Sequence, residues 1–291
     1  MHISRLSVAG VTEFGARLTA EDAWTPLSNL GMEARTTADV IAQTAAIRAR
    51  LIARTGDHGR VEASGLHCPI VAPSKILAIG LNYLDHIKET GATQPERPIL
   101  FAKYANALAG PTDPTILDPS LTAELDYEAE LAVIIGRESR RLEFDDALDS
   151  VYGYAVANDV SARDWQRADS QFSRSKSYDT FCPIGPWITT ADDVEDPQNL
   201  AISSKVNGEV RQNSTTAQML FSVRELLVYL SSTMTLYPGD VILTGTPPGV
   251  GLGFKPPIFL APGDVVECEI AGLGRIRNAV ELDPASPGDR A

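Results

Sequence analysis

The sequence is poor in cysteine. It contains Cys68, Cys182 and Cys268, which are far apart, and it has no Cys-x-x-Cys pair. An odd number of widely spaced cysteines predicts neither a disulfide framework nor a zinc site. We therefore expect reduced, part-buried thiols in a cytoplasmic protein.

Long apolar runs and excess positive charge are also missing. No apolar stretch approaches the roughly 18 residues that a membrane span needs, and residues 1–6 lack the apolar core of a signal peptide. Lysine and arginine number 25 against 38 aspartates and glutamates, which gives a net charge of −13. Binding to nucleic-acid phosphates requires clustered Lys and Arg. We expect neither a nucleic acid nor a membrane as partner.

The remaining composition is that of an ordinary globular protein, with 291 residues, 44% hydrophobic and 22% charged. This length suits one large domain with a small appendage. Residues 1–65 are predicted to form a small N-terminal α+β domain, with strands over 3–9 and 13–18. A helix over 37–54 is predicted to follow, with Thr37 as its N-cap. Residues 66–291 form the larger domain.

An acidic strand is the most informative feature. Residues 125–136 read LDYEAELAVIIG, and the apolar, β-branched second half predicts a strand. Because side chains alternate along a strand, Asp126, Glu128 and Glu130 share one face. The Cα atoms of Glu128 and Glu130 would lie about 7 Å apart, and Mg²⁺ prefers carboxylate oxygens. The pattern leaves two interpretations open, a metal site and a strand with one wet, acidic face.

A histidine and a glutamate follow a short apolar strand at residues 75–80. His86 and Glu89 are three residues apart in a predicted short helix, so they lie on one face. A carboxylate beside an imidazole fixes its tautomer and raises its basicity, which suits a general base. A surface ion pair would have the same spacing. The loop 91–98 that follows is a candidate lid.

A third polar group follows the buried strand predicted over 151–159. Asp159, Arg163 and Gln166 have the i, i+4, i+7 spacing of one helical face. An acid, a guanidinium and an amide on one face suit the binding of a carboxylate beside a metal. A solvated helix face with an Asp–Arg ion pair explains the same spacing.

The last third of the chain predicts mostly β structure. Residues 200–206 lead into Asn207-Gly208, a dipeptide that suits a type I′ hairpin turn. Residues 222–231 predict an amphipathic helix, and residues 265–270 predict a final strand.

Two further polar residues stand in loops. Lys176 lies in a polar loop, where a lysine is usually solvated. Thr246 opens the glycine-rich loop 246–251, which lacks the Gly-Lys-Ser/Thr of a phosphate loop. The amides and hydroxyl of this loop can still hold a carboxylate, although a plain connection is the simpler interpretation.

Taken together and in this order, the motifs resemble the fumarylacetoacetate hydrolase family over residues 74–280. The matching segments are GLNY at 80–83 with Asp85-His86, EAE at 128–130, NDVSARD at 158–164, KSYD at 176–179, GPW at 185–187, VNGE at 206–209, PGD at 238–240 and TGTPPG at 244–249.

The resemblance implies a mixed α+β, mostly β fold, a β-sandwich roll, assembled as a homodimer. It implies Mg²⁺ or Mn²⁺ held by Glu128, Glu130 and Asp159. The general base pair of the family falls on His86 and Glu89, its substrate-anchoring residues on Arg163, Gln166, Lys176 and Thr246. The further metal-binding aspartate of the long eukaryotic-type hydrolases has no counterpart here, so the chain resembles the shorter branch. Asp126 is interpreted as a neighbour of the metal site.

The function expected from this resemblance is metal-dependent hydrolysis of a C–C bond in a small 2-oxo acid. The substrate would be a 2,4-dioxo acid, acylpyruvate-like or fumarylpyruvate-like, and Lys176 would help to stabilise an enolate. The same enolate would serve an oxaloacetate decarboxylase, an unsaturated keto-acid isomerase or a sugar-acid dehydratase. A non-catalytic protein that binds small acids is the alternative from another class, and the His86–Glu89 pair argues against it.

Overall fold

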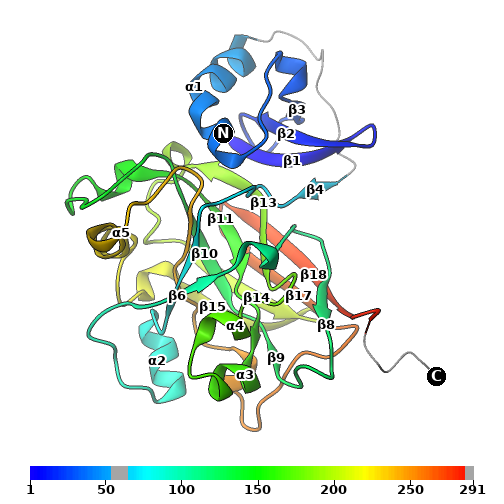
Figure 1. Cartoon of the computed structure of the whole chain (residues 1–291), viewed down its shortest axis with the longest axis vertical. Helices are drawn as coiled ribbons and strands as arrows, with labels where there is room; N and C mark the ends of the chain where they lie inside the picture. Colours follow the sequence, from blue (N-terminus) through cyan, green and yellow to red (C-terminus); the bar gives the residue numbers. More distant parts are fainter. Residues whose placement is uncertain (54–64, 286–291) are drawn as a thin grey trace.

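The computed structural model describes residues 1–53 and 65–285, and the fold is mixed α+β with strands predominating, as predicted (Figure 1). An 11-stranded sheet has the order β3-β2-β1-β13-β11-β10-β16-β5-β6, with β4 paired to β1 and β7 to β13. Its strands are β1 His2–Val8, β2 Val11–Arg17, β3 Thr25–Pro26, β4 Leu66–His67, β5 Ile76–Gly80, β6 Ile99–Lys103, β7 Leu108–Ala109, β10 Ala129–Ile135, β11 Val151–Asn158, β13 Cys182–Thr190 and β16 Val241–Leu243.

A five-stranded sheet packs against the centre of the large one and completes the sandwich. Its strands are β8 Thr115–Leu117, β14 Ala201–Val206, β15 Glu209–Thr215, β17 Val265–Ile270 and β18 Gly274–Leu282. Alternate residues of β17 and β18 are buried, which is the pattern of strands with one face on a core. By contrast, every residue of β10 and β11 is buried, because these strands are covered on both faces.

Helices are few and short. They are α1 Thr37–Ala53, α2 Leu84–Thr90, α3 Arg163–Ala168, α4 Phe172–Ser175 and α5 Val223–Thr233, with single 3-10 turns η1 Ser28–Leu30, η2 Ala105–Ala107, η3 Ala147–Ser150, η4 Ala191–Asp193, η5 Thr216–Gln218 and η6 Gly251–Gly253. Within the described parts of the chain, no helix combines the length and apolarity needed to cross a membrane. Figure 1 shows α2, α3 and α4 together at the end of the molecule away from β1 and β2.

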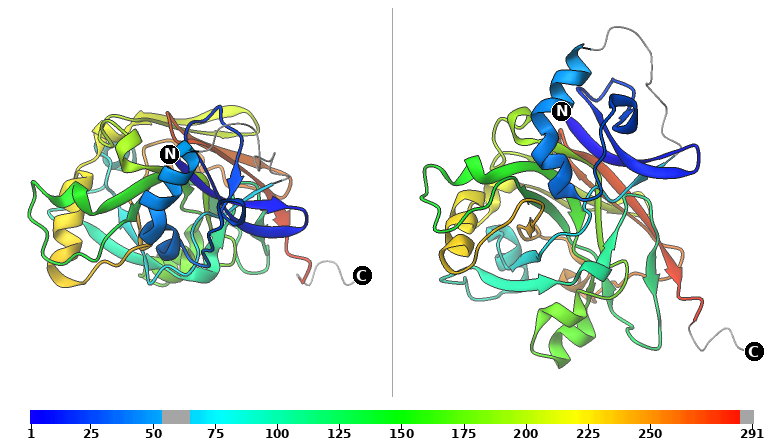
Figure 2. Two further views of the ribbon diagram at one scale, coloured as in Figure 1. Left: turned by 90° about the horizontal axis from the view of Figure 1, so that it is seen from above. Right: turned by 45° about the horizontal axis from the view of Figure 1, so that its top comes forward.

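The N-terminal strands extend the large sheet. Strand β1 pairs with β13 through His2↔Thr189 and Ile3↔Ile188, and Met1 and Ile3 belong to the main apolar core. The right view of Figure 2 shows the N-terminal helix and strands, in blue, gathered at the top of the molecule. The division into residues 1–65 and 66–291 stays a prediction, and residues 54–64 at its boundary lie outside the described part of the chain.

Two local predictions are corrected by the side-chain contacts. Thr36 rather than Thr37 caps α1, because the Thr36 hydroxyl accepts from the Asp39 amide at 3.1 Å. The Thr37 hydroxyl instead donates to the Pro69 carbonyl at 3.0 Å. The acidic strand is also interrupted, since β9 Leu125–Asp126 pairs with β12 Ser161–Ala162 before β10 begins at Ala129.

Two elements of the last third were predicted well and one was missed. Asn207 and Gly208 both have positive φ, 53° and 81°, as a type I′ turn between β14 and β15 requires. Ser222 caps α5 in a capping box with Glu225. Strand β18 was not predicted, because the buried Asn278 interrupts the alternation of apolar and polar residues along it.

Candidate active site

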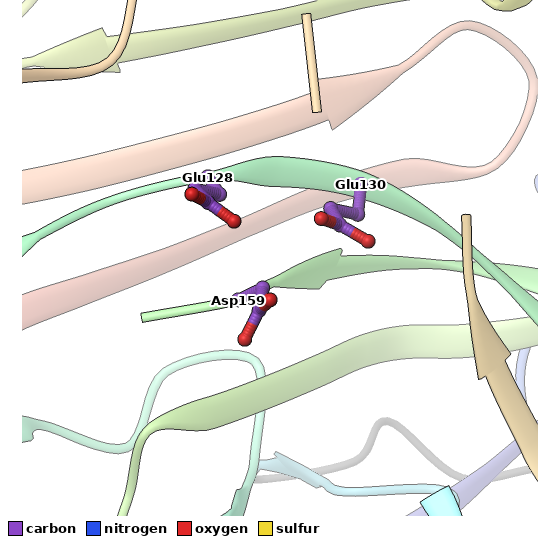
Figure 3. A group of neighbouring side chains, drawn as sticks. All are labelled: Glu128, Glu130 and Asp159. Atoms are coloured by element: carbon purple, nitrogen blue, oxygen red, sulfur yellow. The ribbon is translucent and has the colours of Figure 1, made fainter. Parts of the chain in front are cut away.

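Three carboxylates converge where β10 begins and β11 ends. The antiparallel register pairs Ala129 with Asn158. One step further along, the Asp159 amide donates to the Glu128 carbonyl at 2.9 Å, so these two residues lie opposite each other. Residues directly opposite on antiparallel strands place their side chains on the same face, and Glu130 shares that face by the two-residue repeat. Figure 3 shows the three carboxylates grouped at these strand ends.

This group fits a hard divalent cation. One oxygen from each of Glu128, Glu130 and Asp159 lies within 4.8 Å of the others, and all three residues are buried. Mg²⁺ and Ca²⁺ take oxygen ligands at about 2.0–2.6 Å, so one cation can contact all three carboxylates. Burial, followed by the charges of Asp159 and Glu128, raises the pKa of Glu130 well above its ordinary value. A carboxyl group in that environment holds a proton unless a cation replaces it.

Buried ammonium groups neutralise part of this charge. Lys176 Nζ lies 2.6 Å from Glu128 Oε2 and 2.7 Å from Asp159 Oδ2. Lys103 Nζ lies 2.5 Å from Asp159 Oδ1. Burial alone would raise the pKa of Glu128, but the charges of Lys176 and Arg163 outweigh it and lower this pKa to about 2. Burial alone would likewise lower the pKa of Lys176, but Asp159 and Glu128 raise it, so the ammonium stays charged.

Arg163 joins two carboxylates. Its Nη2 atom lies 2.7 Å from Glu128 Oε1, and its Nε donates to Asp126 Oδ2 at 2.8 Å. Its Nη1 donates to Gln166 Oε1 at 3.0 Å, which leaves the Gln166 amide nitrogen to face a ligand. Four buried carboxylates (Asp126, Glu128, Glu130 and Asp159) therefore meet three buried cations (Lys103, Arg163 and Lys176). The negative charge in excess is what a bound metal cation would compensate.

Asp126 also binds the backbone of the loop after β16, which lines the cavity through Leu252. Its Oδ1 accepts from the Gly251 amide at 2.7 Å and its Oδ2 from the Leu252 amide at 3.0 Å. The side chain is completely buried. Asp126 is thus the link between Arg163 and the loop after β16, which explains a carboxylate that the sequence marked only as a neighbour.

His86 and Glu89, the two residues predicted to act as a general base, are in contact. His86 Nδ1 lies 2.9 Å from Glu89 Oε2 on α2, and Glu89 Oε1 accepts from the Gly249 amide at 2.8 Å. Helix α2 ends at Gly91, whose φ of 66° is the left-handed conformation that favours glycine at this position. Because Glu89 occupies Nδ1, Nε2 is the ring nitrogen of His86 left to exchange a proton.

A cavity of about 270 Å³ connects these groups. Its polar lining residues are His86, Thr90, Glu128, Glu130, Arg163, Gln166, Arg167, Lys176 and Thr246. Its other lining residues are Ile79, Gly80, Leu81, Phe101, Phe172, Val250 and Leu252. A larger hollow of about 370 Å³ beside Asp193 and Gly272 shares none of these residues. The smaller cavity has the convergent charges expected of a binding site.

Seven of the nine site residues predicted from the sequence line this cavity. Glu89 and Asp159 are not among the lining residues, and they contact His86 and Lys176. The helical spacing of Asp159 with Arg163 and Gln166 was wrong, since α3 begins only at Arg163 and Asp159 lies in the connection between β11 and β12. The Thr246 hydroxyl donates to the Ala129 carbonyl at 2.9 Å, so its hydroxyl proton is not available for a hydrogen bond to a ligand.

Three participants were missed. Lys103 ends a short strand, and no local pattern connects it to Asp159, which follows 56 residues later. Gln212 accepts from the Ala129 amide at 3.0 Å and donates to Thr246 at 2.8 Å, but it lies within an unremarkable hairpin strand. Arg167 lies one turn after Arg163 on α3, and its i+4 spacing was the signal that could have identified it.

Comparison with known proteins gives matches over most of the chain. Residues 75–281 match the family model described as fumarylacetoacetate (FAA) hydrolase, C-terminal. A bovine protein named oxaloacetate tautomerase FAHD2A, mitochondrial, is 51% identical over 214 residues, which cover 73% of this chain and 68% of the bovine one. The fumarylacetoacetate hydrolase structure from Exiguobacterium antarcticum has a TM-score of 0.85 and 39% identity, covering 97% of this chain and all of that one.

A third relative is described together with its ligands. The structure of maleylpyruvate hydrolase from Sphingobium sp. SYK-6, in complex with manganese(II) ion and pyruvate, has a TM-score of 0.78 and 32% identity. It covers 97% of this chain and 99% of that chain. The match extends over most of the chain in sequence and nearly all of it in structure. The chain belongs to the fumarylacetoacetate hydrolase family.

Proposed function

We propose that this chain is a Mg²⁺- or Mn²⁺-dependent enzyme that interconverts the keto and enol forms of oxaloacetate. The observation that carries the proposal is the cluster of three carboxylates, Glu128, Glu130 and Asp159, beside a small cavity that His86 also lines. The name of the bovine relative, oxaloacetate tautomerase, supports this choice of reaction.

The chemistry divides between the cation and the side chains. A divalent cation held by the three carboxylates would supply a Lewis acid for the adjacent carboxylate and 2-oxo oxygens of the substrate. His86 Nε2 removes a proton from C3, and Glu89 holds the imidazole in the tautomer and orientation that this requires. Lys176, whose raised pKa keeps it charged, stabilises the negative charge that develops on the enolate oxygen. His86 then delivers this proton to the enolate oxygen, which gives the enol, and the reverse transfers regenerate the keto form.

Hydrolysis of a C–C bond in a 2,4-dioxo acid is the second candidate. It is favoured by the His86–Glu89 pair, because such a pair can also activate a water molecule. The maleylpyruvate hydrolase relative, described with pyruvate, supports it further. Decarboxylation of oxaloacetate leads to a related enolate but requires no activated water.

One experiment separates these reactions. The Mn²⁺-loaded protein is given enol-oxaloacetate, keto-oxaloacetate, an acylpyruvate and fumarylpyruvate, and the products are followed by ultraviolet absorbance and by NMR. We expect accelerated interconversion of the oxaloacetate forms without loss of CO₂. Rates equal to those without protein would contradict the proposed tautomerase, and cleavage of a dioxo acid would establish the second candidate in its place.

A further inference from the structure

The buried cations of the site are already committed to protein carboxylates. Arg163 contacts Asp126 and Glu128, and Lys176 lies between Glu128 and Asp159. All these groups are less than a tenth exposed. A buried charge that loses its partner is strongly destabilised, so neither cation is free to leave its partners for a distant substrate group.

Arg167 is a cation of a different kind in the same cavity wall. Its side chain is 56% exposed, and its Nη2 atom lies 2.7 Å from Glu124 Oε1. Glu124 is its only hydrogen-bond or ion-pair partner among residues 1–53 and 65–285. Exposed ion pairs of this type contribute little to stability. A guanidinium has five N–H donors, so Arg167 can bind a second carboxylate without leaving Glu124.

The position of Arg167 fixes which part of a substrate it can reach. Arg163 and Arg167 are four residues apart on α3, so Arg167 lies about 6 Å further along the helix axis, from a rise of 1.5 Å per residue. Arg163 contacts Glu128, which belongs to the group of three carboxylates at the candidate metal site. A substrate whose 2-oxo acid end lies at that group would therefore extend its other end toward Arg167.

We propose that Arg167 binds the distal carboxylate of the substrate and thereby selects 2-oxo dicarboxylates over 2-oxo monocarboxylates. This inference rests on the proposed function, because it uses the 2-oxo acid orientation assumed there. The apolar lining residues, which include Leu81, Phe101 and Leu252, offer no partner for an anion. Without Arg167, the same cavity would favour substrates with an apolar end.

The test compares two substrates that differ at this end. Oxaloacetate carries a carboxylate where phenylpyruvate carries a phenyl ring, and both form enols that are measured by absorbance. In Arg167→Gln we expect kcat/KM for oxaloacetate to fall roughly 10- to 100-fold, the range of a charged hydrogen bond, mainly through KM. The value for phenylpyruvate should stay unchanged or rise, and Arg167→Lys should recover part of the loss for oxaloacetate.

Arg174→Gln is the matched control. Arg174 is an exposed arginine on the neighbouring α4, paired with Asp169 by two hydrogen bonds, and it does not line the cavity. An oxaloacetate kcat/KM in Arg167→Gln within twofold of the wild type, or an equal loss in both variants, would overturn the inference.

Failure of the proposed function gives a different result. In that case the wild type itself would not tautomerise oxaloacetate. The role of Arg167 is then measured by hydrolysis of fumarylpyruvate, which has a distal carboxylate, against acetylpyruvate, which has none. A selective loss for fumarylpyruvate in Arg167→Gln would support the inference, and equal rates in variant and wild type would overturn it.

Discussion

Glu89 holds His86 by one carboxylate oxygen and the backbone of a distant loop by the other. Glu89 Oε2 lies 2.9 Å from His86 Nδ1, and Glu89 Oε1 accepts from the Gly249 amide at 2.8 Å. Helix α2 and the loop after β16, far apart in the sequence, are therefore connected through one side chain. This contact positions the imidazole.

The first prediction concerns His86 and Glu89 as a unit. His86→Ala should lower kcat by roughly 10²–10⁴, the usual contribution of a general base, and leave Mn²⁺ affinity nearly unchanged. Glu89→Gln should have a similar effect, and the double variant should be little worse than either single one. Steady-state kinetics and calorimetric Mn²⁺ titrations measure these effects.

His67→Ala is the control, because His67 pairs with Ser7 away from the site. Full activity of His86→Ala would remove the assignment of the base. Additive losses in the double variant would show that the two residues act separately.

A second prediction tests the space around Glu89. Gly253 lies close to Glu89. A Cβ atom added at Gly253 would be 2.6 Å from the Glu89 carboxyl group. Gly253→Ala should therefore displace Glu89 and lower kcat, by up to about 10², as misplacement of catalytic groups by about 1 Å does. Mn²⁺ affinity should not change. Gly65→Ala, where an added Cβ meets no atom of residues 1–53 and 65–285 within 4 Å, is the control. Equal kcat values for both variants would contradict this account.

The third prediction is a pH dependence of stability. Glu130 has a pKa raised above its ordinary value of 4.5, so the folded protein binds this proton more tightly than the unfolded chain. The stabilisation is complete below 4.5 and is lost as the pH rises through the raised pKa. Mn²⁺ takes the place of the proton, so the difference in Tm between Mn²⁺-loaded and metal-free protein should widen as the pH rises above 4.5 through the raised pKa.

The Glu130→Gln variant provides the comparison for this measurement. Without a titrating group at that position, the metal-free protein should lose less stability across the same pH range. An identical pH slope in Glu130→Gln and the wild type would show that Glu130 is not the group responsible.

The sequence was sufficient to predict those contacts of the site that join residues close together in the chain. Glu128 and Glu130 share a face because a strand alternates, and His86 and Glu89 meet because a helix places i and i+3 together. The grouping of Asp159 with Arg163 and Gln166 was inferred from a helical spacing that does not exist. Its place beside Glu128 was implied by the family resemblance alone, and in the structure Asp159 lies opposite Glu128 next to the β10–β11 pair. Sheet register, which depends on tertiary pairing, decides that contact.

Long-range partners could not be predicted for the same reason. Lys103 and Gln212 contact residues 56 and 83 positions away, and neither has a local pattern that marks its role. The N-terminal strands look like an independent unit in the sequence, but β1 pairs with β13 across most of the chain length. The homodimer, the small 2-oxo acid partner and the cytoplasmic location stay predictions.

The central claim is that Glu128, Glu130 and Asp159 hold the cation on which turnover depends. The most direct measurement is oxaloacetate tautomerisation by chelator-treated protein as Mn²⁺ is added back, with bound Mn²⁺ counted by electron paramagnetic resonance in the same samples. We predict no turnover in the metal-free protein, turnover in proportion to bound Mn²⁺ up to one ion per chain, and loss of both in Glu130→Gln. Undiminished turnover in metal-free protein, or normal Mn²⁺ binding by Glu130→Gln, would contradict the claim.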